Sequence, residues 1–160
     1  MSESATFLLD VNALVALALP QHTHHFAAHA WIGNLAKKAK WASTPVTEAA
    51  FIRLLLNPAV TGGQGYSFQT AATQLNMMKH WPGATHEFLP DASSLAEPSL
   101  APELLVAALV GHRQVTDFHL LNLAAANGCR LATFDTAFSR AVPQAEHLFE
   151  VIPALKADSD

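Results

Sequence analysis

The stretch that decides the fold is FLLDVNAL, residues 7–14, near the amino end of the chain. Its first three residues are apolar and predict a short buried strand, and an apolar helical run follows and stops at Pro20. A strand, a turn and a helix in this order are typical of the opening of a parallel α/β fold. Asp10 stands between the strand and the helix, where such folds place their ligand sites.

The same alternation continues along the chain. Apolar runs predict further strands at 41–43, 86–89, 130–134 and 148–152. Helical patterns with caps or breakers cover 24–40, 46–56, 68–80, 117–127 and 136–141, and another helix is expected up to residue 110. Candidate N-caps are Thr44 or Thr47, Ser67 and Thr116. We therefore expect an α/β fold, a three-layer α/β/α sandwich on a central, mostly parallel sheet, as one domain over 1–160 with its core at about 6–152.

Composition narrows the class of protein. The 160 residues are 51% hydrophobic and 14% charged, which indicates one large core and excludes disorder. A net charge of -4 argues against a general nucleic-acid coat or a polybasic membrane binder. The single Cys129 forms no internal disulfide, the amino end is acidic, and the longest apolar runs are far shorter than the ~20 residues of a membrane span. We expect a cytoplasmic protein that neither is secreted nor contacts a membrane.

The acidic residues are distributed unevenly. Of thirteen, four stand at a strand end or in a helix first turn within the apolar segments, namely Asp10, Glu48, Asp117 and Asp135. Taken singly, Asp10 and Asp135 are ordinary helix N-caps, and the other two complement a helix dipole. In a parallel sheet, however, these positions share one edge, so four carboxylates can meet there and require protonation or a divalent cation. Oxygen ligands alone favour Mg²⁺ or Mn²⁺ over Zn²⁺.

Four segments in this order resemble the acidic motifs of PIN-domain ribonucleases, and more narrowly those of the VapC toxins of bacterial toxin–antitoxin modules. They are FLLDVNAL (7–14), TEAAFIR (47–53), HRQVTD (112–117) and LATFD (131–135). The resemblance covers about residues 6–152 and implies an α/β/α sandwich, a Mg²⁺ or Mn²⁺ site, and endonucleolytic cleavage of RNA. By motif position it assigns a catalytic, metal-binding quartet to Asp10, Glu48, Asp117 and Asp135, with Asn12 and Thr133 as supporting polar residues.

The resemblance also implies partners. A small cognate VapB-type antitoxin would fill an apolar groove between helices, hold the nuclease inactive and link the complex to promoter DNA, whereas the chain itself has little charge for binding DNA. A homodimer is also implied, with the stripe 28–39 or the helix 68–80 as candidate contacts. Outside the quartet, nine acidic and nine basic residues balance, so RNA need not be repelled once metal is bound. Arg113 and Arg53 lie about one helical turn from Asp117 and Glu48 and could contact phosphate.

Two other functions stay open at this point. One is a catalytically silent PIN-like module that binds only RNA or protein. The other is a phosphatase of the haloacid-dehalogenase type with Asp10 as nucleophile, although Asn12 stands where those enzymes have a second aspartate. The residues His22, His24, His25 and His29 form a local cluster with one i, i+4 pair, but no carboxylate or cysteine nearby completes a metal site, so we interpret it as a polar helix entrance. His112 and His119 flank Asp117 and are left out of the catalytic set.

Overall fold

The computed structural model describes residues 4–100 and 114–155. Its five strands are β1 (Thr6–Leu9), β2 (Lys40–Ser43), β3 (Thr85–Phe88), β4 (Arg130–Thr133) and β5 (Phe149–Val151). They form one sheet in the order β3-β2-β1-β4-β5, and every pairing is parallel. The helix expected to end near residue 110, together with His112 and Arg113, lies outside the described residues.

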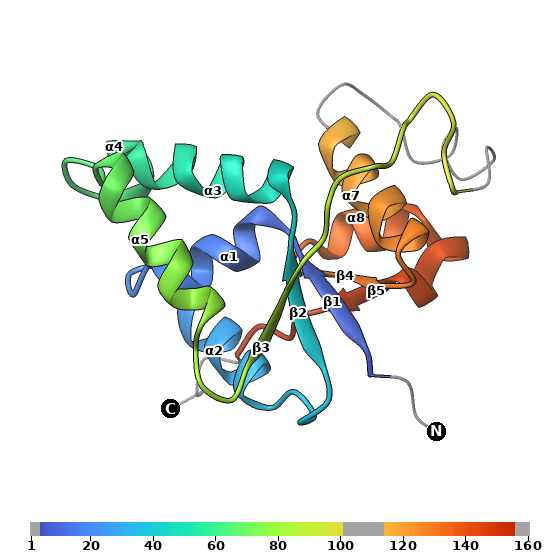
Figure 1. The fold of residues 1–160 in the computed structure, drawn as a ribbon, viewed down its shortest axis with the longest axis horizontal. Helices are drawn as coiled ribbons and strands as arrows, with labels where there is room; N and C mark the ends of the chain where they lie inside the picture. Colours follow the sequence, from blue (N-terminus) through green and yellow to red (C-terminus); the bar gives the residue numbers. More distant parts are fainter. Residues whose placement is uncertain (1–3, 101–113, 156–160) are drawn as a thin grey trace.

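Helices cover both faces of this sheet (Figure 1). On one side lie α1 (Val11–Ala18), α2 (His25–Gly33), α3 (Pro45–Leu56), α4 (Pro58–Thr61) and α5 (Phe68–Lys79). On the other lie α7 (Val115–Ala126), α8 (Thr136–Ala141) and a 3₁₀ helix, η2 (Pro143–Leu148). Two separate buried clusters fill the spaces, one containing Leu14 and Phe51 and the other Phe118 and Phe138. The three-layer sandwich expected from the sequence is therefore confirmed.

Most of the predicted helix starts are confirmed by capping contacts. Asp10, Ser67 and Asp135 each accept a hydrogen bond from a backbone N–H three residues on, at 2.9, 3.1 and 2.9 Å. Thr44, and not Thr47, is the residue that precedes α3. The prediction for Thr116 was wrong, because α7 begins at Val115 and Gln114 takes the capping position.

The largest difference from the predicted elements concerns the helix expected over 24–40. It ends at Gly33, and Asn34 is its C-cap. The chain must leave the helix here because β2 starts at Lys40, whose N–H donates to the carbonyl of Ala5 at 2.9 Å. The apolar residues between them, including Leu35 and Ala39, still pack on the core, which explains why the helical spacing continued to suggest a helix. The short α4 and η2 were not predicted, since neither is long enough to show a period.

The histidine pair of α2 has a structural role at the end of α1. His25 Nδ1 lies 2.7 Å from the carbonyl oxygen of Ala16, and His29 Nε2 lies 2.8 Å from that of Leu17. These carbonyls belong to the last turn of α1, which has no following helical N–H groups to bind them. The i, i+4 spacing therefore places two donors against one helix end.

Across residues 4–100 and 114–155, none of the helices has the length and hydropathy to cross a membrane.

Candidate active site

The site forms at the point where the strand order reverses. β2 and then β3 follow on one side of β1, and β4 and then β5 follow on the other. Asp10 follows β1 and Asp135 follows β4, and these two strands are neighbours. The carboxyl ends of parallel strands at such a reversal are the common ligand position in open α/β sheets.

Asp10 is fixed and nearly inaccessible, with 8% of the residue exposed. Its N–H donates to the carbonyl of Ala132 at 3.0 Å, which ties it to β4. One carboxylate oxygen, Oδ1, accepts the N–H of Ala13 at 2.9 Å, and the other, Oδ2, accepts the hydroxyl of Thr133. Each oxygen of the carboxylate therefore has a hydrogen-bond partner that restrains its orientation.

Thr133 joins two of the acids. Besides donating to Asp10, its hydroxyl oxygen accepts the backbone N–H of Asp135 at 3.0 Å. Asp135 is itself exposed, and its Oδ1 accepts the N–H of Phe138 at the start of α8. The supporting position that the motif resemblance gave to Thr133 thus lies between Asp10 and Asp135.

The aspartates influence one another electrostatically. The pKa of Asp10 is raised to about 6, chiefly by burial and to a smaller extent by the charges of Asp117 and Asp135, against the opposing effect of its hydrogen bonds from Thr133 and Ala13. The pKa of Asp117, which is half-buried, is raised by burial and by Asp135. Three segments far apart in the sequence therefore bring Asp10, Asp117 and Asp135 into one negatively charged region.

Glu48 follows the neighbouring strand β2 but has its own partners. Its Oε1 accepts the hydroxyl of Ser43 at 2.6 Å and forms an ion pair with Lys79 of α5. His86 of β3 contacts the same serine oxygen through Nε2 at 2.8 Å. Burial, followed by the charge of Lys79, lowers the pKa of His86 to about 4, so the ring is neutral near pH 7. Since the serine hydrogen is given to Glu48, His86 Nε2–H must be the donor to Ser43.

The remaining predicted residues are more isolated. Asn12 lies in the first turn of α1 and is exposed, and Arg53 lies exposed in the last turn of α3. Neither has a hydrogen bond or ion pair from its side chain to any residue in the described part of the chain. Arg113 lies outside it.

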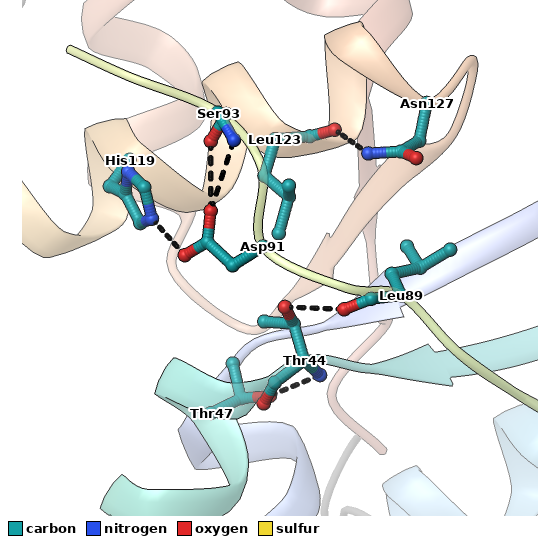
Figure 2. A network of polar contacts seen from close by, with 8 residues as sticks. All are labelled: Thr44, Thr47, Leu89, Asp91, Ser93, His119, Leu123 and Asn127. Atoms are coloured by element: carbon teal, nitrogen blue, oxygen red, sulfur yellow. Dashed lines mark hydrogen bonds and ion pairs between the residues drawn. The ribbon is translucent and has the colours of Figure 1, made fainter.

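The position of α7, which supplies Asp117, depends on the segment after β3 (Figure 2). Thr44 donates its hydroxyl to the carbonyl of Leu89 at 2.8 Å, and two residues later Asp91 Oδ2 contacts His119 Nε2 of α7 at 2.5 Å. Burial tends to raise the pKa of Asp91, but the hydrogen bond and charge from His119, together with the hydrogen bonds from Ser93, outweigh it and lower the pKa. His119 therefore fixes the first turns of α7, close to Asp117, through a side-chain partner.

Sequence reasoning did not find Ser43, His86, Lys79 or Asp91. Lys79 lies on a different helix from Glu48, and no local spacing links the two. A weak signal existed for Ser43, a small polar residue at the carboxyl end of a strand. Within 4–100 and 114–155, no three His, Cys, Asp or Glu side chains are grouped so that they could hold a metal ion.

Comparison with known proteins identifies the family. No family model matches the chain. It is 41% identical over 134 residues to ribonuclease VapC39 of Mycobacterium tuberculosis, an alignment covering 84% of this chain and 91% of that protein. It is 43% identical over 128 residues to ribonuclease VapC38 of the same organism, covering 80% and 84%. The chain belongs to the VapC ribonuclease family.

Solved structures agree on the fold of this VapC-family chain. The crystal structure of VapBC2 from Rickettsia felis, bound to a DNA fragment from its promoter, includes a chain that matches with a TM-score of 0.62 at 16% identity, covering 91% of this chain and 98% of the other. A chain of FitAB bound to IR36 DNA matches with a TM-score of 0.60 at 19% identity, covering 96% and 99%. At these identities the likeness shows a shared α/β/α fold.

Proposed function

We propose that the protein is a metal-dependent endoribonuclease and the toxin of a VapBC-type toxin–antitoxin module. The observation that supports this most is the gathering of Asp10, Asp117 and Asp135, from three separate segments, at the strand reversal of a chain related to VapC ribonucleases. Family membership favours a nuclease over the phosphatase with Asp10 as nucleophile. The single buried thiol of Cys129 suits a reducing compartment, and we propose the cytoplasm as the site of action.

The ligand chemistry of these acids, which offer oxygen atoms alone, suits Mg²⁺ or Mn²⁺. Asp10 and Asp117, whose pKa values are raised by burial and by neighbouring aspartates, are stabilised by a hard divalent cation, and oxygen is the ligand atom that such cations select. We propose that Asp10, Asp117 and Asp135 hold the metal, joined by Glu48 through its second oxygen. The bound metal would acidify a water and neutralise charge on the phosphodiester. The chain's own part is to hold Asp10 rigid through Thr133 and Ala13 and to keep α7 in place through His119.

Metal dependence is the first test of this function. Purified protein should cleave single-stranded RNA when Mg²⁺ or Mn²⁺ is added and stop when EDTA is added, because the proposed reaction uses a water acidified by the metal. Cleavage products separated on a denaturing gel give the measurement, and sequencing their ends identifies the preferred RNA. RNA binding without cleavage at any metal concentration would instead support the catalytically silent module.

We further propose a cognate VapB-type antitoxin as partner, and a second copy of the chain. Support comes from the solved toxin–antitoxin complexes that share this fold. On α5, Phe68 and Met77 are exposed while Leu75 and Met78 face the core, so this helix keeps an apolar surface for contact. Contact of the complex with DNA would come through the antitoxin.

Growth of a bacterial culture tests the partnership. Expression of the chain alone should arrest growth, and co-expression with the small protein encoded beside it should restore growth and yield a co-purifying complex. The Asp117→Asn variant is the matched control, since it should be harmless alone and still bind the antitoxin. Harmless expression of the wild type without any co-purifying partner would contradict the toxin assignment while leaving a solitary nuclease possible.

A further inference from the structure

The Glu48 carboxylate is held by one oxygen only. Both the Ser43 hydroxyl and the Lys79 ammonium contact Oε1, while Oε2 accepts no hydrogen bond from the described residues. His86 fixes Ser43 from the other side at 2.8 Å. Glu48 can therefore offer Oε2 to another group without releasing Lys79.

Lys79 is held in place yet accessible. It is the last residue of α5, which packs beside α3 (Figure 1), and its side chain is 22% exposed. The ammonium lies 5.2 Å from the ring centroid of Phe88, so an aromatic face and a carboxylate both restrain it. With Glu48, Asn76 and Phe68 it lines a surface hollow of about 330 Å³ between the two helices. A ligand in this hollow can reach the ammonium.

Charge indicates the kind of ligand. In the described ranges, Lys79 is the cation that forms an ion pair with one of the four candidate acids. Asp10, Asp117 and Asp135 have no such partner there, and without Lys79 the carboxylate of Glu48 would also repel a polyanion. A lysine ammonium is a compact donor with three hydrogens, suited to phosphate oxygens.

We propose that Lys79 binds a backbone phosphate of RNA next to the cleavage position, with Glu48 Oε1 and Phe88 holding the ammonium ready. This inference rests on the proposed function and adds a substrate-binding residue to it. Glu48 then has two roles, because Oε1 anchors Lys79 while Oε2 is left for the metal. Arg53, which is exposed and has no side-chain partner in the described residues, lacks such positioning.

RNA binding at several salt concentrations tests the role. The probe is a short, labelled single-stranded RNA of mixed sequence, measured by fluorescence anisotropy with EDTA present to prevent cleavage. Lys79→Gln should weaken binding about tenfold, since one charge-assisted phosphate contact is lost. It should also reduce the slope of log affinity against log salt by about 0.7. Lys79→Arg should retain both affinity and slope.

Lys40→Gln is the matched control. Lys40 also pairs with a glutamate, Glu87, at 3.6 Å, but at the amino end of β2 and thus at the opposite edge of the sheet. Its replacement should change neither affinity nor slope. Because glutamine can still donate to Glu48, Lys79→Gln should keep the melting temperature near that of wild type, and a Mn²⁺-induced rise in melting temperature should persist.

The outcomes separate this proposal from the wider function. If the wild type cleaves RNA and Lys79→Gln binds the probe with unchanged affinity and slope, Lys79 is only a structural partner of Glu48 and the proposal fails alone. An equal loss in Lys79→Arg or Lys40→Gln would also overturn it. If the wild type neither binds nor cleaves RNA, the proposed function fails together with it.

Discussion

Asp10→Asn is expected to lower the rate of RNA cleavage on the order of a thousandfold, and Asp117→Asn by a similar factor. Each change removes one negative charge from the proposed metal site, and metal ions supply several kcal/mol of transition-state stabilisation. Asparagine keeps the shape of both side chains and, at position 10, can still accept the N–H of Ala13 as a helix cap. Single-turnover cleavage at saturating Mg²⁺ gives the rate.

The control for this experiment is Asp91→Asn. Asp91 is also a partly buried aspartate, but it contacts His119 and Ser93 and lies outside the proposed metal set. Its replacement should reduce activity far less than that of Asp10 or Asp117. Cleavage at wild-type rates by both Asp10→Asn and Asp117→Asn would show that the site has been assigned to the wrong residues.

The second large effect concerns stability and pH. Asp10 has a pKa of about 6 in the folded chain, above the 3.8 of an unperturbed aspartate. A carboxyl with a raised pKa favours folding while protonated, so this contribution is complete below about pH 4 and is lost as pH rises through 6. The difference between these two pKa values corresponds to a loss of about 3 kcal/mol in the free energy of unfolding at neutral pH. Asp10→Asn removes that cost, so without metal it should be more stable than wild type at pH 7 by up to about this amount.

Urea unfolding in EDTA between about pH 4 and pH 7 measures this difference. The gain in Asp10→Asn should grow with pH and nearly vanish at the acidic end. Asp91→Asn should instead lose stability relative to wild type at neutral pH, because the pKa of Asp91 is lowered. The stabilising effect of the Asp91 carboxylate is present above the unperturbed pKa and is lost on acidification. A neutral-pH loss of stability in Asp10→Asn would mean that the hydrogen bonds to Asp10 outweigh its burial and the neighbouring charges. In Asp10→Asn the cleavage rate should fall while the stability at neutral pH rises. A loss of activity in this variant would therefore not come from a loss of folding.

The sequence by itself determined the sandwich and the location of most of the acids. Short apolar runs followed by capped helices are local signals, and parallel pairing then requires that Asp10, Glu48, Asp117 and Asp135 follow strand ends or open helices near one edge. The predicted caps at Asp10 and Asp135 are confirmed. This signal is also local, because a carboxylate binds the free N–H groups at the start of its own helix. The helix end at Gly33 was missed because the apolar spacing continues beyond it, into a turn that only the position of β2 requires.

Only the tertiary structure decided which of the four acids interact with one another and which has other partners. Asp10, Asp117 and Asp135 interact with one another, whereas Glu48 is bound by Lys79 and Ser43, with His86 behind them. These partners come from α5, β2 and β3, and the chain between them has no fixed spacing that a sequence pattern could reveal. The same is true of Asp91 and His119, which meet across 28 positions. Local patterns specify which residues begin and end each element, but the contacts between side chains of different elements depend on how the layers pack.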